Sequence, residues 1–204
     1  MYDVSVPMAL VDYIPVALFL LSGIYLMRDL YGKMTKYAFA LLAGGTINTT
    51  LAGFLKATWK LLYAAGICDF QVLNKMLLPT QSLGLLMTGL SLVLMLAVKS
   101  GKKLRSAAPP VFAGTMIFIP LMVLGLGGIC SSLSIIAKRM KKGWLIPLFI
   151  LCFFCYMTMG YLASRDGTLA WVNWVEQGVN ILGQVLLLFG VLTLHKAGLK
   201  DLEL

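Results

Sequence analysis

The stretch WVNWVEQGVNILGQVLLLFGVLTL, residues 171–194, decides the fold class because it joins membrane-spanning length to a stripe of polar side chains. Glu176 is its one charged residue, and a bilayer core requires about 20 mainly apolar residues per helix. Asn173, Glu176, Gln177, Asn180 and Gln184 stand at relative positions 0, 3, 4, 7 and 11, which is one face of an α-helix. We therefore expect a transmembrane helix whose polar face lies against protein or water, not lipid.

The rest of the chain has the same character. Of its 204 residues, 60% are hydrophobic and 12% are charged, against about 25% charged in an average soluble domain. Residues 37–55, 76–98, 106–137 and 143–164 contain no Asp, Glu, Lys or Arg. The sequence therefore predicts an all-α polytopic membrane protein, with residues 1–204 forming a single integral membrane domain.

About six transmembrane helices are expected, over residues 8–27, 37–55, 77–98, 111–136, 144–163 and 169–194. The first segment lacks a basic flank, which favours a retained helix over a cleaved signal peptide. The segment after the second span, with Lys56 and Lys60, suits an interfacial helix or a continuation of that span. The fourth span is long and rich in Pro and Gly, so we expect a tilt, a kink or a break near Gly127–Gly128.

An internal repeat is suggested by two alignments. YIPVALFLLSGI (13–24) aligns with FIPLMVLGLGGI (118–129), and QSLGLLMTGLSLVLMLAVK (81–99) aligns with QGVNILGQVLLLFGVLTLH (177–195). The repeat halves would be residues 8–99 and 111–196. With six crossings the two sides of the membrane receive eight and nine Lys and Arg residues, as an inverted pair of three-helix repeats predicts.

A second topology stays open. If residues 106–137 return to the side on which they start, 13 Lys and Arg residues lie on one side and four on the other. That division obeys the positive-inside rule better than the nearly even one. It also requires irregular backbone to be buried inside the remaining helices, and we therefore favour six crossings.

The candidate site is a small polar cavity between helices, to which several polar faces contribute. The sixth span offers the stripe described above, the third offers Gln81 and Thr88, the second offers Asn48, and the first offers Asp12 near its start. Ser, Thr, Asn and Gln also stabilise helix packing, so packing remains the alternative for these groups. Glu176 is an ionisable group within a span, which indicates function, although a pair with Arg165 or a neighbouring Lys is open.

These patterns favour a small multi-pass membrane protein that binds or transports a small polar solute or ion through an intramembrane site. The alternative is a non-transporting sensor or scaffold subunit that partners another protein, with the polar faces serving helix packing. An enzyme is the least favoured class, because no HExxH, GxSxG or Walker motif occurs. The sequence predicts neither a cofactor nor a metal site.

The expected partners follow from the charge pattern and the cavity. The net charge of +9 resides in loops such as KRMKK (138–142), which predicts contact with anionic lipid headgroups and not with nucleic acid. The cavity predicts a small polar solute or cation as ligand, while a homodimer or a partner subunit stays open. The expected location is the cell membrane.

Overall fold

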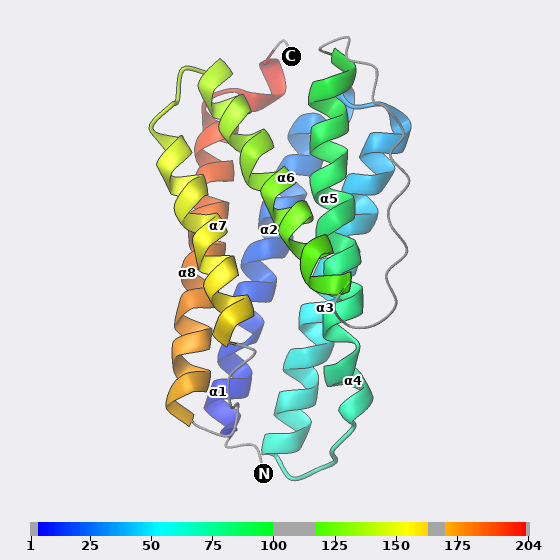
Figure 1. Ribbon diagram of the computed structural model, residues 1–204, viewed down its shortest axis with the longest axis vertical. Coiled ribbons are helices and arrows are strands. Elements are labelled where there is room, and N and C mark those ends of the chain that lie inside the picture. The colour runs from blue at the N-terminus through cyan, green and yellow to red at the C-terminus, as the bar shows by residue number, and fades with distance from the viewer. Residues whose placement is uncertain (1–3, 100–116, 163–169, 203–204) are drawn as a thin grey trace.

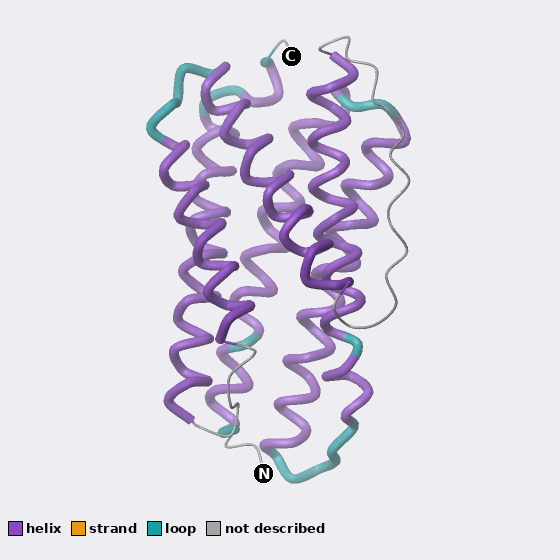
Figure 2. Tube along the Cα trace, in the orientation of Figure 1, coloured by secondary structure: helices purple, strands orange, loops and turns teal. Residues whose placement is uncertain are grey.

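The computed structural model describes residues 4–99, 117–162 and 170–202, and in this part of the chain every regular element is a helix (Figure 2). The long helices are α2 (Tyr13–Leu30), α3 (Lys36–Ala64), α5 (Leu77–Lys99), α6 (Phe118–Arg139), α7 (Leu145–Leu162) and α8 (Ala170–Lys196). The short ones are α1 (Val6–Val11), η1 (Tyr31–Lys33), α4 (Gln71–Lys75) and η3 (Leu199–Asp201). Helices are the expected solution, because each satisfies its own backbone hydrogen bonds in lipid.

Five helices of the described chain are long and apolar enough to cross a membrane. They cover Val6–Lys33, Lys36–Ala64, Gln71–Ala97, Phe118–Arg139 and Trp171–Lys196, while the apolar helix Leu145–Met159 is shorter. Large apolar side chains stand exposed on the outside of all these helices, as contact with lipid requires. The protein is therefore an all-helical, membrane-embedded chain, as the sequence predicts.

The six long helices form a closed ring. Each packs against two neighbours, in the order α2, α3, α5, α6, α7, α8 and back to α2 (Figure 1). Of the two alternatives for the segment with Lys56 and Lys60, the structure has the continuation of the second span, because α3 extends to Ala64. Of the tilt, kink or break expected near Gly127 and Gly128, the break is wrong, because α6 is continuous there; the first part of the predicted fourth span lies outside the described residues.

Close contacts at glycines show that α5 and α6 run in the same direction. A Cβ on Gly125 would lie 2.6 Å from the Leu85 carbonyl oxygen, and a Cβ on Gly128 would lie 3.2 Å from the Gly89 Cα. Residue numbers therefore rise together along α5 and α6, and these two helices run parallel. Because glycine has no side chain, the two helix backbones can approach closely, as in small-residue motifs of other membrane helices.

The inverted repeat that the sequence suggested is not confirmed. The helices α2, α3 and α5 run up, down and up in Figure 1, and α6, α7 and α8 do the same. The parallel contact of α5 with α6 gives both three-helix groups one orientation. An inverted pair would require α6 to start at the end of the bundle where α5 finishes, whereas both helices finish at the same end.

Basic side chains gather at one end of the bundle as a consequence. This end, which we call the basic end, holds the C-termini of α2, α5, α6 and α8 and the N-terminus of α3. The Lys and Arg residues whose side chains are described there are Arg28, Lys33, Lys36, Lys138, Arg139, Lys141, Lys142, Lys196 and Lys200. The opposite half of the described chain carries Lys56, Lys60 and Lys75.

The basic end is closed by a packed apolar core. Leu30, Leu133, Ile136, Leu194 and Leu199 are fully buried there, and they come from α2, α6, α8 and η3. Complete burial of a leucine or isoleucine side chain contributes about 1.5–3 kcal/mol. The basic end of the ring therefore has a packed apolar interior.

An Asp–His pair joins α2 to α8 at the basic end. The Asp29 side chain is 1% exposed, and the His195 Nδ1 atom lies 2.8 and 2.9 Å from its two carboxylate oxygens. We expect His195→Phe to lower the free energy of unfolding by about 2 kcal/mol, because it leaves a buried carboxylate without its donor. Thermal unfolding in detergent measures the change. The control is Lys196→Gln, one exposed residue further on, and equal stability of His195→Phe and this control would contradict the prediction.

Candidate functional site

A cavity of about 440 Å³ lies inside the ring, and all six long helices contribute to its wall. Its polar lining consists of Asp12, Thr49, Thr50, Lys56, Gln81, Tyr156, Tyr161, Glu176, Gln177, Asn180 and Gln184. Its apolar lining includes Pro15, Val16, Phe19, Met122, Val123 and Met157. Small-molecule sites typically combine an apolar wall with a few converging polar groups in about 300–1,000 Å³.

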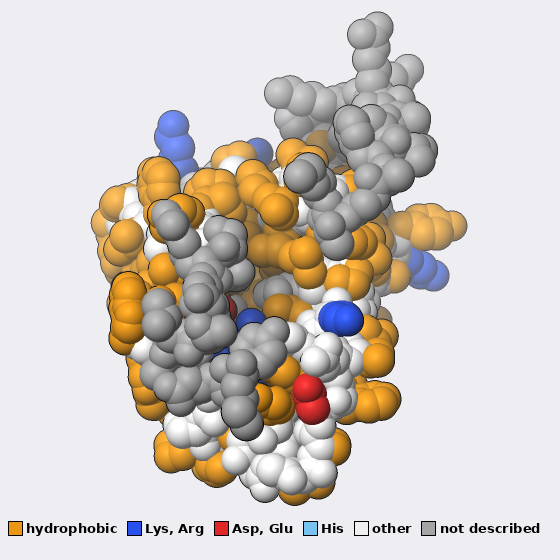
Figure 3. Space-filling model, turned by 60° about the horizontal axis from the view of Figure 1, so that its bottom comes forward, with side chains coloured by type: hydrophobic (Ala, Val, Ile, Leu, Met, Phe, Trp, Pro, Cys, Tyr) orange, Lys and Arg blue, Asp and Glu red, His pale blue; other side chains and the backbone are white. Residues whose placement is uncertain are grey.

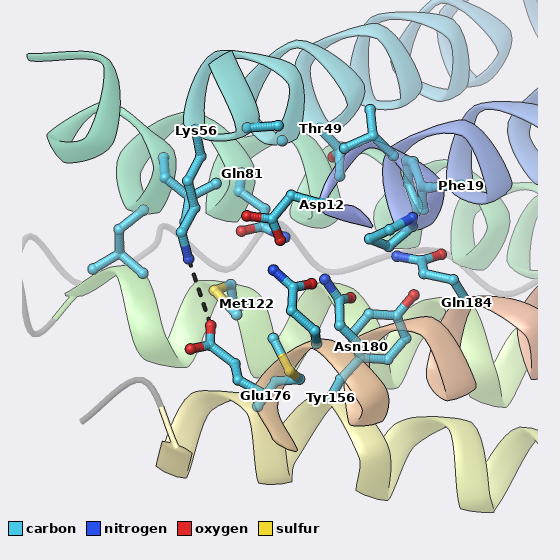
Figure 4. A pocket seen from close by; sticks show the side chains of 18 of the residues that line it. Asp12, Phe19, Thr49, Lys56, Gln81, Met122, Tyr156, Glu176, Asn180 and Gln184 are labelled. Carbon is cyan, nitrogen blue, oxygen red and sulfur yellow. Dashed lines mark ion pairs between the residues drawn. The ribbon is translucent and has the colours of Figure 1, made fainter. Parts of the chain in front are cut away.

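The cavity has a charged part and a deeper, uncharged part. Figure 4 shows Lys56, Asp12 and Glu176 together, with Phe19, Gln184 and Tyr156 further along the bundle. The charged residues belong to the ends of α2, α3 and α8 that lie away from the basic end. Figure 3 views the molecule from this side and shows acidic and basic side chains recessed among hydrophobic ones.

The predicted polar stripe of α8 faces this cavity. Glu176, Gln177, Asn180 and Gln184 all line it, because spacings of three and four residues repeat on one face of a helix. The other side of α8 exposes Val175, Leu182 and Val185, among other apolar side chains, as a lipid-facing surface does. From the other helices, the predicted residues Asp12 and Gln81 also line the cavity.

Three predicted site residues do not line the cavity. Asn48 donates from Nδ2 to the Thr80 carbonyl oxygen at 3.2 Å, and so links α3 to α5. Thr88 donates to the Gly84 carbonyl oxygen of its own helix at 2.9 Å. Asn173 is buried, but it lies outside the cavity wall. The helix-packing alternative describes the Asn48 contact, whereas the Thr88 hydroxyl bonds within its own helix.

Two ion pairs link α3 to the helices across the cavity. The Lys60 Nζ atom lies 2.7 Å from Asp12 Oδ2, and the two side chains are 6% and 10% exposed. The Lys56 Nζ atom lies 3.5 Å from Glu176 Oε1, and these side chains are 24% and 13% exposed. Two carboxylates thus face two ammonium groups. The second pair is the looser one and the more accessible.

Sequence reasoning placed Lys56 and Lys60 outside the site, in an interfacial segment. A signal for both was nevertheless present. Thr49, Gly53, Lys56 and Lys60 are spaced by four, three and four residues, so they share one face of α3. The helical-spacing argument that identified the polar stripe of α8 would also have identified both lysines on α3. No periodic signal marks Tyr156 or Phe19 among the apolar residues of their helices.

Several buried oxygens on the cavity wall have no hydrogen-bond partner within the part of the chain that the structure describes. Besides the ion-paired Asp12 carboxylate, they are Thr49 Oγ1, Tyr156 Oη, Gln177 Oε1 and Gln184 Oε1. Each of these four side chains is more than nine-tenths buried. A buried polar group without a partner costs about 1–3 kcal/mol, and such groups call for an explanation. These four oxygens converge on one cavity, so a polar ligand bound there could supply the partners that the described residues do not.

The cysteines of the described chain are the next candidate for a site. Cys130 and Cys152 are buried thiols, and Cys152 donates to the Gly183 carbonyl oxygen at 3.3 Å. Among the described residues, no three His, Cys, Asp or Glu side chains are grouped so that they could hold a metal ion. The cavity is therefore the feature from which function is argued. No family model matches the chain, and no curated protein or solved structure was found to be similar to it.

Proposed function

We propose that the protein binds a small polar solute in the central cavity and carries it across the membrane. The observation that supports this most is that four buried oxygens without a partner among the described residues converge on one cavity of about 440 Å³. Packing alone does not account for them, because polar groups that serve helix packing are paired with neighbouring helices. A solute that bonds to Gln177, Gln184, Tyr156 and Thr49 restores the missing hydrogen bonds.

The arrangement of the helices supports transport in particular. The two groups α2–α3–α5 and α6–α7–α8 run in the same sequence of directions, and the cavity lies between them. Gln81 and Gln177, which the repeat alignment pairs, both line it. Parallel repeats related by an axis along the membrane normal occur in transporters, where the two halves open in turn around a site near the midplane. We propose that the two three-helix groups open in turn around the cavity in this way. In the present structure, the packed apolar core at the basic end would be the closed gate.

The charge distribution supports an orientation. In membrane proteins, Lys and Arg residues are concentrated in cytoplasmic loops. We therefore propose that the protein lies in the cell membrane with its basic end facing the cytoplasm. The cavity then approaches the outer surface, and the solute enters between α3 and α8 near Lys56 and Glu176. Basic side chains at the other end would contact anionic headgroups of the inner leaflet.

Cys68 is a natural probe of this orientation. It is exposed and precedes α4 at the end away from the basic one, whereas Cys130, Cys152 and Cys155 are buried. A membrane-impermeant maleimide added to intact cells is therefore expected to label the wild-type protein and not Cys68→Ser. Labelling that requires cell lysis would reverse the proposed orientation.

A thermal-unfolding screen of the purified protein tests solute binding. At a concentration of 100 Kd, a ligand of the folded state raises stability by about 2.7 kcal/mol. We expect one solute class among amino acids, vitamins, nucleosides and inorganic ions to stabilise the wild type. The same solute should stabilise Gln184→Leu far less, because its side chain no longer bonds in the cavity, and Tyr156→Phe should show a smaller loss.

The matched control for this screen is Thr193→Val. Thr193 also lies on α8, but its hydroxyl donates to the Phe189 carbonyl oxygen of the same helix and does not line the cavity. Its solute response should equal that of the wild type. If no solute stabilises any variant, and Gln184→Leu unfolds at the wild-type temperature or above, the transport proposal fails and a subunit that partners another protein takes its place.

A further inference from the structure

We propose that the cavity selects zwitterions: solutes of zero net charge that carry an ammonium and a carboxylate group on an apolar body, as in an apolar α-amino acid. The Lys56–Glu176 pair is the one that opens for the solute. This inference rests on the proposed solute-binding function and adds the chemical class of the solute.

The first argument is charge balance. Asp12 and Glu176 are matched by Lys60 and Lys56, so the charged part of the cavity is neutral as a whole. An unpaired charge within a membrane-embedded site is costly. A cation or an anion would add one such charge, whereas a zwitterion adds none.

The second argument is the difference between the two ion pairs. The Asp12–Lys60 pair is shorter, at 2.7 Å, and more deeply buried, so it is suited to hold the helices together. The Lys56–Glu176 distance of 3.5 Å exceeds the usual 2.7–2.9 Å of a charge-assisted hydrogen bond. A solute can therefore enter between these side chains, with its carboxylate on Lys56 and its ammonium on Glu176. The exchange replaces one ion pair by two and breaks no tight contact.

The third argument is the wall beyond the charged part. Figure 4 shows Met122 beside the Lys56–Glu176 pair, with Asn180, Tyr156 and Phe19 farther along the cavity. An apolar solute body fits against the methionine and aromatic side chains, because thioethers adapt their shape and contact rings favourably. The amide and hydroxyl groups beside them accept or donate to polar atoms of a longer body, such as the peptide bond of an apolar dipeptide.

Compounds that share one apolar body separate the effect of charge from that of shape. We choose L-phenylalanine, the cation phenethylamine and the anion 3-phenylpropionate, together with L-leucine, 3-methylbutylamine and 4-methylpentanoate. Binding is measured by thermal unfolding and by direct titration of the full chain in lipid nanodiscs. The wild type is expected to bind at least one of the two zwitterions at least tenfold more tightly than either singly charged analogue.

Two variants are expected to redirect this preference. Glu176→Gln leaves Lys56 without its partner, so the anion should now bind more tightly than the zwitterion. Lys56→Gln leaves Glu176, so the amine should become the preferred ligand. Lys75→Gln is the control, since Lys75 is exposed on α4 outside the cavity, and it should keep the wild-type order.

The outcomes separate the two proposals. Equal wild-type binding of a zwitterion and its singly charged analogues, or an unchanged order in both Glu176→Gln and Lys56→Gln, overturns the zwitterion proposal. Binding of an uncharged solute alone also overturns it, while the solute-binding function stands. If neither this series nor the broader screen yields a ligand, both proposals fail.

Discussion

Gly125→Ala is expected to lower the free energy of unfolding by about 3 kcal/mol, because one methyl group forces α5 and α6 apart. The added Cβ would lie 2.5 Å from the Leu85 carbonyl carbon and 2.6 Å from the Leu86 nitrogen. These are backbone atoms within a helix, so they cannot move aside as a side chain does. The movement must be made by a whole helix, and it disturbs the ring next to the cavity.

The same helix provides a control of opposite sign. A Cβ on Gly127 has Phe153 as its nearest neighbour, at an ordinary van der Waals distance of 3.9 Å. Gly127→Ala should therefore raise stability by up to about 1 kcal/mol, which is the helix-propensity difference between the two residues. Unfolding of both variants in detergent, followed by tryptophan fluorescence, measures the contrast. Equal effects of the two substitutions would refute the close parallel packing of α5 on α6.

Lys60→Met is expected to destabilise the protein by about 3–5 kcal/mol, because it leaves the Asp12 carboxylate buried without its partner. The side chains of this pair are 6% and 10% exposed, so water cannot replace the lost ammonium group. The double variant Asp12→Asn with Lys60→Met should recover most of the loss, since both charges are then absent. A double-mutant cycle of unfolding free energies gives the coupling.

The second ion pair supplies the comparison for this prediction. Lys56→Met should cost clearly less than Lys60→Met, because the Lys56 side chain is 24% exposed and its pair with Glu176 is longer. Additive effects of Asp12→Asn and Lys60→Met would show that the two charges do not interact in the folded protein. The assignment of a structural role to Asp12–Lys60, and of the ligand role to Lys56–Glu176, would then be lost.

The polar face of α8 illustrates how far a periodic pattern leads. Glu176, Gln177, Asn180 and Gln184 were predicted to share a protein-facing surface, and all four line the cavity. Helical spacing determines which side chains share a face. A polar face is unfavourable in contact with lipid, so it must point into the protein. The spacing does not show which residues of other helices this face contacts. For Glu176 the sequence predicts either a functional role or a pair with Arg165 or a neighbouring lysine. Arg165 lies outside the described residues, and the observed pair with Lys56 depends on α3 lying near α8.

By itself the sequence determined the membrane-embedded helical class, the approximate spans and the polar stripe of α8, because hydrophobicity and helical period are local properties. Only the tertiary structure decided the direction of α6, since an apolar run reads as a span in either direction. It also decided the pairing of Asp12 with Lys60 and the convergence of Thr49, Tyr156, Gln177 and Gln184 on one cavity. These contacts join residues of different helices, so they depend on how the helices pack together, which a local sequence pattern does not specify.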